Sequence, residues 1–182
     1  MPKVQRRGMQ YLAQNITSEC WLSAYKMMFT WKGRSANAPE QILGANEAFL
    51  QDAKAKGLDQ KDWKPVARAF GLWPVKGGDF SDDWFKGTMK DFGPFLVHGK
   101  FELGMHSIVV IGYEDDFWGT LKMVHYVNPY TFTAGVSEPP QPRMSNFEWL
   151  RKGVKRNNGI DGVIQYWTDK NTAGGSDGWL VD

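Results

Sequence analysis

The chain contains a single cysteine, Cys20, at the boundary between a polar loop and an apolar segment, in the sequence QNITSECWLSAYKMMFTW. The apolar residues after Cys20 recur at helical spacing, and Gly33 follows them as a helix-ending residue. A helix N-terminus carries unpaired backbone N–H groups and a partial positive charge, which favour a thiolate over a thiol. We therefore expect Cys20 to begin a helix and to have a lowered pKa, as suits a nucleophile.

Gln14, which carries a side-chain amide, lies six residues upstream of Cys20. A loop of this length can fold the Gln14 amide back toward the thiol. Its NH₂ group would then donate to an oxyanion, beside the backbone N–H of Cys20. Trp21 is expected to pack the first helical turn against its neighbours. The other interpretation of Cys20 is a small apolar residue buried in the core, which is common for a lone cysteine.

A thiol nucleophile needs a base, and three histidines compete for this role. His106 begins the segment HSIVVIGY, where its side chain can face a cleft at a sheet edge while the following residues anchor the strand. His98 precedes Gly99 and is expected in a solvated loop. His125 is expected to be a half-buried strand residue that is hydrogen-bonded to a neighbour. We therefore predict that His106 is the base.

A third group should orient the imidazole, and Asn128 is the candidate. It follows the segment KMVHYV and precedes Pro129, which should end that strand. If this segment pairs antiparallel with HSIVVIGY through the turn near EDDFWGT, the end of one strand faces the start of the other. That pairing brings Asn128 beside His106. The alternative interpretation of Asn128 is a turn-forming asparagine before proline.

These residues, in the segments QNITSECWLSAY, GMHSIVVIGY and YVNPYT, resemble the papain-like cysteine protease superfamily. The resemblance is strongest to its compact bacterial branch, which includes secreted effector proteases and the peptidase domains of bacteriocin exporters. It implies peptide-bond hydrolysis through a thioester, with Cys20 as nucleophile, His106 as proton carrier, Asn128 as its orienting group and Gln14 in the oxyanion hole. The resemblance spans roughly Tyr11 to Trp167.

The sequence departs from the plant and lysosomal members of this superfamily in two ways. Thr17 and Glu19 replace residues of their C-G-S-C-W pattern. His106 follows Cys20 by 86 residues, whereas about 130 or more separate the two in those enzymes. The substrate loops of those enzymes are therefore not transferred to this chain.

The elements that must position these residues fall into two groups. After the helix at Cys20, helices are predicted from Pro39 to about Lys56 and from Asp62 to Phe70. The segments FLVHG, HSIVVIGY, KMVHYV and GVIQYW are predicted strands. A Pro-rich loop, VSEPPQPRM, precedes SNFE, a capping box that predicts a helix from Asn146 to Lys152. Helices first and strands after them indicate an α+β, papain-like fold with an antiparallel sheet.

Composition limits the domain count and the classes of partner. The 182 residues, of which 42% are hydrophobic, are expected to form one domain over residues 1–182, with a core of about 11–167 and a flexible tail of about 168–182. A formal charge of +2 indicates neither a nucleic acid partner nor an anionic membrane. One cysteine forms no internal disulfide. No cluster of residues has metal-ligand spacing, so neither a metal nor an organic cofactor is expected.

Functional context follows from the beginning of the sequence. It has no signal-peptide pattern, and 13 residues before Gln14 leave no room for an inhibitory propeptide. We expect an effector or toxin that is made in the cytoplasm, is exported by a dedicated secretion system, acts on proteins or peptides and is held in check by an inhibitor or immunity protein. The alternatives are an amidase or transferase acting on cell-wall peptides or glutamine side chains, and a non-catalytic binding module of the same fold.

Overall fold

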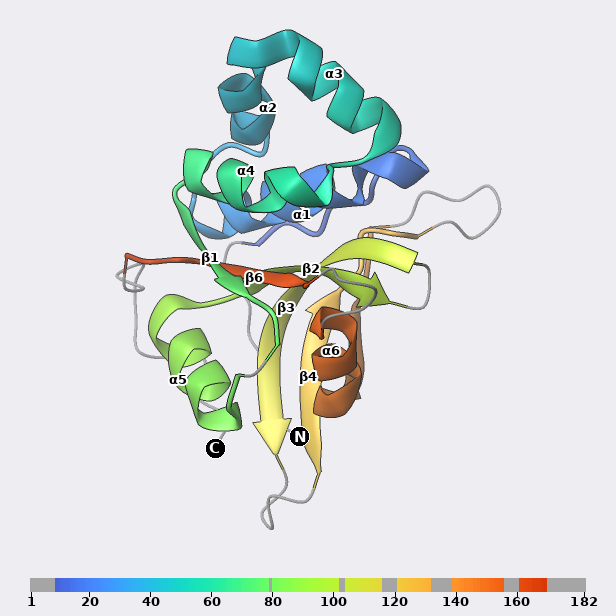
Figure 1. The fold of residues 1–182 in the computed structure, drawn as a ribbon. Coiled ribbons are helices and arrows are strands. Elements are labelled where there is room, and N and C mark those ends of the chain that lie inside the picture. Colours follow the sequence, from blue (N-terminus) through green and yellow to red (C-terminus); the bar gives the residue numbers. More distant parts are fainter. Residues whose placement is uncertain are drawn as a thin grey trace.

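The computed structural model describes residues 9–78, 80–101, 104–115, 121–131, 139–155 and 161–169. In this part of the chain, six strands form one sheet in the order β1-β6-β2-β3-β4-β5, and all neighbouring pairs are antiparallel. Helices lie on both faces of the sheet (Figure 1). The architecture is α+β, as predicted. The strands are β1 (Leu72–Lys76), β2 (Phe95–Phe101), β3 (Gly104–Asp115), β4 (Lys122–Val127), β5 (Pro142–Asn146) and β6 (Val163–Trp167).

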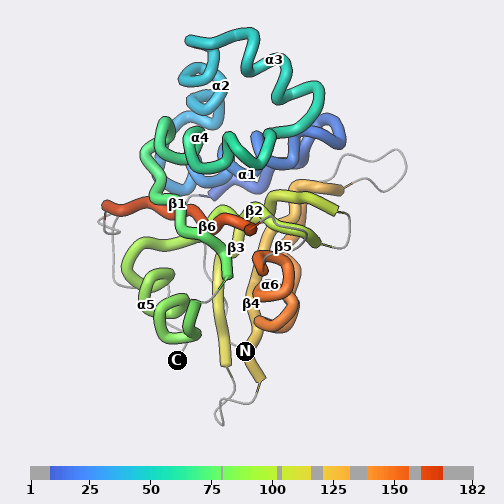
Figure 2. Tube along the Cα trace, viewed as in Figure 1, coloured from blue at the N-terminus to red at the C-terminus, as the bar shows by residue number. Residues whose placement is uncertain are grey.

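The helices divide into two layers around the sheet. Helices α1 to α4 cover one face, and α5 and α6 cover the other, which the trace in Figure 2 also shows. The helices are α1 (Cys20–Trp31), α2 (Ala38–Leu43), α3 (Glu47–Lys56), α4 (Trp63–Ala69), α5 (Asp82–Phe92) and α6 (Phe147–Val154), with 3₁₀ turns η1 (Thr17–Glu19), η2 (Gly44–Asn46) and η3 (Gln60–Asp62).

Two hydrophobic cores result, one on each side of the sheet. In β3, Val109 and Ile111 belong to the core under α1, while Ile108 and Val110 belong to the core under α5 and α6. This alternation follows from the two-residue period of a strand. Because both faces are covered, β3 is buried through most of its length. The strand that carries His106 is therefore held from both sides.

Helix α1 starts at Cys20, as predicted, and is the most deeply buried helix of its layer. The indole N–H of Trp21 donates to the backbone oxygen of Ala53 in α3, at 3.2 Å. This bond fixes the first turn against the neighbouring helix, which confirms the packing role expected for Trp21. Cys20 thus stands on a rigid support.

The predicted pairing of the strands that carry His106 and Asn128 is confirmed. Strands β3 and β4 are antiparallel, with Val109 opposite Val127. Most of the turn predicted near EDDFWGT, residues 116–120, lies outside the described residues. The start of β3 and the end of β4 therefore meet at one end of the sheet.

Two helix boundaries differ from the predictions for the same physical reason, an asparagine cap. The single helix predicted from Pro39 to Lys56 is divided, because the Asn46 side chain accepts a hydrogen bond from the N–H of Phe49 and starts α3 anew. At SNFE the cap is Asn146, which accepts from the N–H of Trp149 at 2.8 Å. The expected Ser145 belongs to β5 instead.

Three elements were not predicted, namely β1, α5 and β5. Part of the expected Pro-rich loop, from Pro142 onward, forms β5, which pairs with β4 at the edge of the sheet. An edge strand tolerates proline because one side of it needs no N–H donor. Helix α5 has a readable signal in Ser81, which caps it by accepting from the N–H of Trp84. Residues 170–182 of the expected flexible tail lie outside the described residues.

Helix α6 approaches β2 so closely that only glycine fits between them. A Cβ atom added at Gly99 would lie 2.4 Å from the backbone oxygen of Gly153 in α6. Gly99 is also opposite His106 in the β2–β3 register. We expect Gly99→Ala to cost about 1–3 kcal/mol in unfolding free energy, because backbone must move to admit the methyl group. Chemical denaturation measures this cost, and Gly44→Ala, where a Cβ meets nothing within 4 Å, is the control.

Candidate active site

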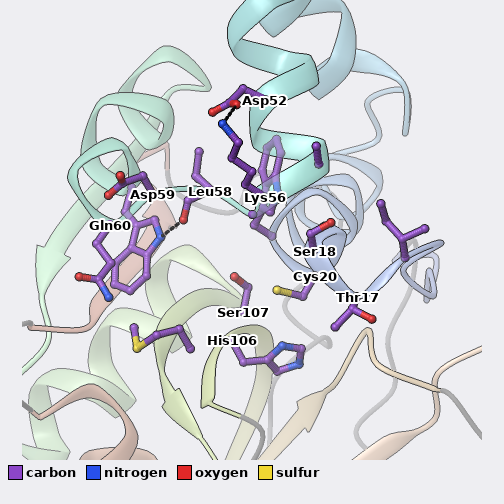
Figure 3. A pocket seen from close by; sticks show the side chains of 16 residues that line it. Thr17, Ser18, Cys20, Asp52, Lys56, Leu58, Asp59, Gln60, His106 and Ser107 are labelled. Atoms are coloured by element: carbon purple, nitrogen blue, oxygen red, sulfur yellow. Dashed lines mark hydrogen bonds and ion pairs between the residues drawn. The ribbon is translucent and has the colours of Figure 1, made fainter.

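Cys20 and His106 line one cleft, with a volume of about 770 Å³, between the α1–α4 layer and the start of β3. Its walls come from residues 16–21, from the segment between Asp52 and Trp63, and from residues 105–107. The side chain of Cys20 points across the cleft toward Ser107, and the ring of His106 lies beside it (Figure 3). A thiol and an imidazole are thus brought to one place.

The pKa of Cys20 differs from the expectation. Burial raises the pKa of the thiol, and contacts with the backbone N–H and the side chain of Ser107 and with the backbone N–H groups of Trp21 and Cys20 oppose this without cancelling it. The helix N-terminus therefore acts in the predicted direction. The prediction of a lowered pKa was wrong because the walls of the cleft desolvate the sulfur.

His106 is hydrogen-bonded to Asn128, whose Oδ1 lies 2.7 Å from the Nε2 of the ring. An amide oxygen only accepts, so Nε2 carries the proton and Nδ1 carries the lone pair. Nδ1 is then the nitrogen that can take a proton from a thiol. Burial lowers the pKa of His106, and the hydrogen bond that the ring donates to Asn128 raises it by less.

Burial favours the uncharged form of both groups, since it raises the pKa of Cys20 and lowers the pKa of His106. When the proton passes from sulfur to nitrogen, two opposite charges appear side by side and stabilise each other. The geometry suits a general base that ionises the nucleophile during attack.

Asn128 fulfils both interpretations that its sequence context allowed. Its Oδ1 lies against the His106 ring and also accepts the backbone N–H of Tyr130 at 2.9 Å. The second contact is the turn typical of asparagine before proline. The turn thus fixes the amide that faces the imidazole.

We expect Asn128→Ala to lower turnover without abolishing it, because the variant frees the ring of His106 but removes no catalytic proton carrier. Asn128→Asp should restore much of the activity, because a carboxylate accepts the same ring N–H. Steady-state turnover of the two variants tests this. Equal loss in both variants would contradict an orienting role.

Gln14 is buried near Cys20, but its side chain is not among those that line the cleft. Its Nε2 donates to the backbone oxygens of Ile16 and Thr17, both at 3.0 Å, and its backbone N–H donates to the oxygen of Pro129. Both amide hydrogens are therefore engaged. A role in the oxyanion hole requires one of these bonds to open when substrate binds.

We expect Gln14→Ala to lower turnover about 100-fold. The loss of one hydrogen-bond donor to the oxyanion raises the activation free energy by about 3 kcal/mol. The rate of Cys20 alkylation should stay near wild type, since alkylation forms no oxyanion. Turnover and alkylation are measured side by side. A parallel fall in both would instead indicate that Gln14 only holds the η1 loop, and unchanged turnover would refute the oxyanion assignment.

The two other histidines do not line the cleft that Cys20 and His106 share. His125 is a half-buried residue of β4, as predicted, but its Nε2 makes no hydrogen bond, although it lies 3.3 Å from Glu114 Oε2. His98 was wrongly predicted in a solvated loop, because β2 continues to Phe101 and the ring is fully buried. Sequence reasoning also missed Ser107, which lies opposite His98 in the β2–β3 register and contacts the thiol.

Among the residues that the structure describes, no group of three or more histidine, cysteine or acidic side chains is arranged to hold a metal ion. No helix of the described ranges has the length and apolar character needed to cross a membrane.

Comparison with known proteins gives one family. The family model described as papain-like cysteine protease AvrRpt2 matches residues 3–135, more than half of the chain. Cys20, His106 and Asn128 all lie inside the matched range. A search of curated proteins gave no match.

Proposed function

Because the chain belongs to the papain-like cysteine protease family of AvrRpt2, we propose that it cleaves peptide bonds in protein substrates through a thioester on Cys20. The observation that carries this proposal is the 2.7 Å contact between His106 Nε2 and Asn128 Oδ1 at a cleft that also contains the only cysteine. The ring then presents its basic nitrogen for the thiol proton.

The first half of the reaction forms the thioester. His106 takes the proton of Cys20 as the sulfur attacks the carbonyl carbon of the substrate. The backbone N–H of Cys20 and one hydrogen of the Gln14 amide hold the resulting oxyanion. His106 then gives its proton to the leaving amine as the C–N bond breaks.

The second half of the reaction releases the acyl group. His106 takes a proton from water, whose oxygen attacks the thioester carbonyl, and the proton then returns to the sulfur as the C–S bond breaks. Asn128 holds the imidazole in one orientation through both halves. The products are a carboxylate and the restored thiol.

In its biological context, the protease acts as an exported effector or toxin, and a partner protein inhibits it where it is made. The description of the matched family supports this role. Co-purification of the inhibitor from the producing cell, followed by loss of turnover when it is added back, tests the partner.

The experiment that tests the activity is incubation of the protein with a proteome, followed by mapping of new peptide N-termini. New N-termini that appear with the wild type and not with Cys20→Ala support the protease. Deamidated or cross-linked glutamine side chains without new N-termini would assign the thioester to an amidase or transferase. Neither change, with no acylation of Cys20 by an activated ester, would indicate a binding module.

A further inference from the structure

A buried histidine that the proposed reaction does not use lies behind the candidate nucleophile. The ring of His98 is fully buried and stacks on Trp63, with ring centroids 4.9 Å apart and planes inclined by 13°. Burial first, and then the nearby His106, lower the pKa of His98 to about 3. The ring is therefore neutral at physiological pH and carries one proton, on either Nδ1 or Nε2.

Ser107 connects this ring to the cleft. It lies opposite His98 in the β2–β3 register, directly after His106, and only 3% of it is exposed. Its hydroxyl oxygen is 2.7 Å from His98 Nδ1. Figure 3 shows the same hydroxyl beside the sulfur of Cys20, at the wall of the cleft. One serine side chain thus stands between the buried ring and the candidate nucleophile.

The contacts of Ser107 with the sulfur favour the thiolate. Burial raises the pKa of Cys20, and Ser107 opposes this both with its backbone N–H and with its side chain. A contact that lowers the pKa of a thiol stabilises its ionised form, and a thiolate can only accept hydrogen bonds. The hydroxyl of Ser107 is therefore a donor when the sulfur is ionised.

This donor role decides which nitrogen of His98 carries the proton. The hydroxyl of Ser107 has one hydrogen, so while it points to the sulfur its oxygen can only accept from the ring, and the proton is on Nδ1. Nε2 lies 3.4 Å from the hydroxyl oxygen of Tyr25, which is longer than an ordinary N–H···O bond. Tyr25 gives its own hydrogen to Gln165 Oε1 at 2.7 Å, so this hydroxyl does not depend on the ring.

On the basis of the proposed function, we propose that Ser107 is a further catalytic residue, which stabilises the thiolate of Cys20, and that His98 is the positioning residue that holds the Ser107 hydroxyl. The Nδ1–H of His98 donates to the serine oxygen, and the serine hydrogen faces the sulfur when Cys20 gives its proton to His106. A neutral ring suits this role, because it orients the hydroxyl without a second positive charge beside protonated His106.

The first test measures how the rate of Cys20 alkylation by iodoacetamide depends on pH, because the thiolate is the form that reacts. Ser107→Ala removes the hydroxyl and keeps the backbone N–H, so we expect the midpoint to rise by about one pH unit. Ser23→Ala is the matched control, since Ser23 is a buried serine of α1 that donates to the backbone oxygen of Ala13 at 3.1 Å and does not line the cleft. An unmoved midpoint in Ser107→Ala, or an equal shift in both variants, would overturn the proposal.

The same shift is then measured without the neighbouring imidazole, because Ser107 directly follows His106. In the His106→Ala background, Ser107→Ala should still raise the midpoint by about one pH unit. A shift that disappears there would show that Ser107 acts only by placing His106, and would overturn the proposal. These variants leave unchanged the charged residues near the thiol in the described part of the chain, which are Asp52, Lys56 and Asp59 in the cleft wall and Glu19, with Lys54 beside it, directly before Cys20.

Two substitutions test the positioning role of His98. His98→Leu removes the donor to Ser107, and we expect the alkylation midpoint to rise by about half a pH unit. His98→Asn places an amide N–H near the position of Nδ1–H, so it should keep the midpoint close to the wild-type value. Circular dichroism checks that both variants fold. Equal shifts in the two folded variants would mean that the ring only fills space, and would refute its role.

A measurement on the wild-type protein needs no change at a buried position. The tautomer of His98 is read by ¹⁵N NMR of the imidazole rings above the alkylation midpoint, where the sulfur is ionised. We expect a proton on Nδ1 and none on Nε2. The signals of the other two rings are identified by their loss in His106→Ala and His125→Gln. A proton on Nε2 would make the ring an acceptor for the Ser107 hydroxyl and overturn the proposal.

None of these tests uses a substrate, so the two proposals fail separately. A midpoint that rises as expected in Ser107→Ala, in a protein that cleaves no peptide, would support the stabilised thiolate and refute the protease. Peptide cleavage by a protein whose midpoint is unmoved in Ser107→Ala would do the reverse.

Discussion

Cys20→Ala is expected to abolish peptide cleavage, with a loss on the order of 10⁶-fold by analogy with other nucleophile deletions. No other thiol exists in the chain to replace it. Without sulfur no thioester forms, and only the binding of substrate remains. Cleavage of a protein substrate identified by N-terminus mapping, followed as product against time, measures this loss.

The same variant should remain folded. Cys20 is only half-buried at the wall of a cleft, whereas Trp21 and the following residues carry the packing of α1. We expect a melting temperature within a few degrees of wild type, since the change removes one sulfur atom beside open space. Cys20→Ser serves as a second inactive variant of nearly the same shape. An unfolded variant, or one that still cleaves, would favour the interpretation of Cys20 as a core residue.

His106→Ala is expected to lower turnover by on the order of 10⁴-fold or more, because the variant has no group to take the thiol proton or to protonate the leaving amine. His125→Gln is the matched control, because its ring lies in β4 near Glu114 and away from the cleft. Loss of activity in the control at unchanged stability, with His106→Ala still active, would show that the base was wrongly assigned.

The pH dependence of turnover also tests the assignment of His106 as the base. Only the neutral ring of His106 acts as a base, and burial lowers its pKa below the ordinary value of 6.5. The acid limb of the profile should therefore lie below pH 6.5, with activity lost as pH falls through the pKa of His106. An acid limb above pH 6.5 would contradict the geometry of a desolvated, Asn128-bound ring.

Much of the site was predictable because its residues stand at element boundaries. Helical spacing after Cys20 places the thiol at the start of α1, and strand pairing brings Asn128 to His106. Both inferences rest on local periodicity and one antiparallel turn, which a sequence displays directly.

The parts that were not predictable depend on what packs over a residue. The sequence FLVHGK suggests a strand that ends at a glycine, yet Gly99 is needed within β2 because α6 lies against it. His98 is buried as a result. Likewise, the sign of the shift in the pKa of Cys20 depends on the cleft walls rather than on the helix that begins there.

The division of the molecule into a helical layer and a sheet has a kinetic consequence. Cys20 stands on α1, while His106 lies on β3 and Asn128 directly follows β4, so these three side chains come together only when the two layers dock. Long-range closures of this kind form late in folding, because the chain must first lose the entropy of the intervening loop. During refolding from denaturant, peptidase activity should therefore return with the slowest phase, after the helical signal in circular dichroism has recovered. The newly synthesised chain then cleaves no peptide until this final docking step.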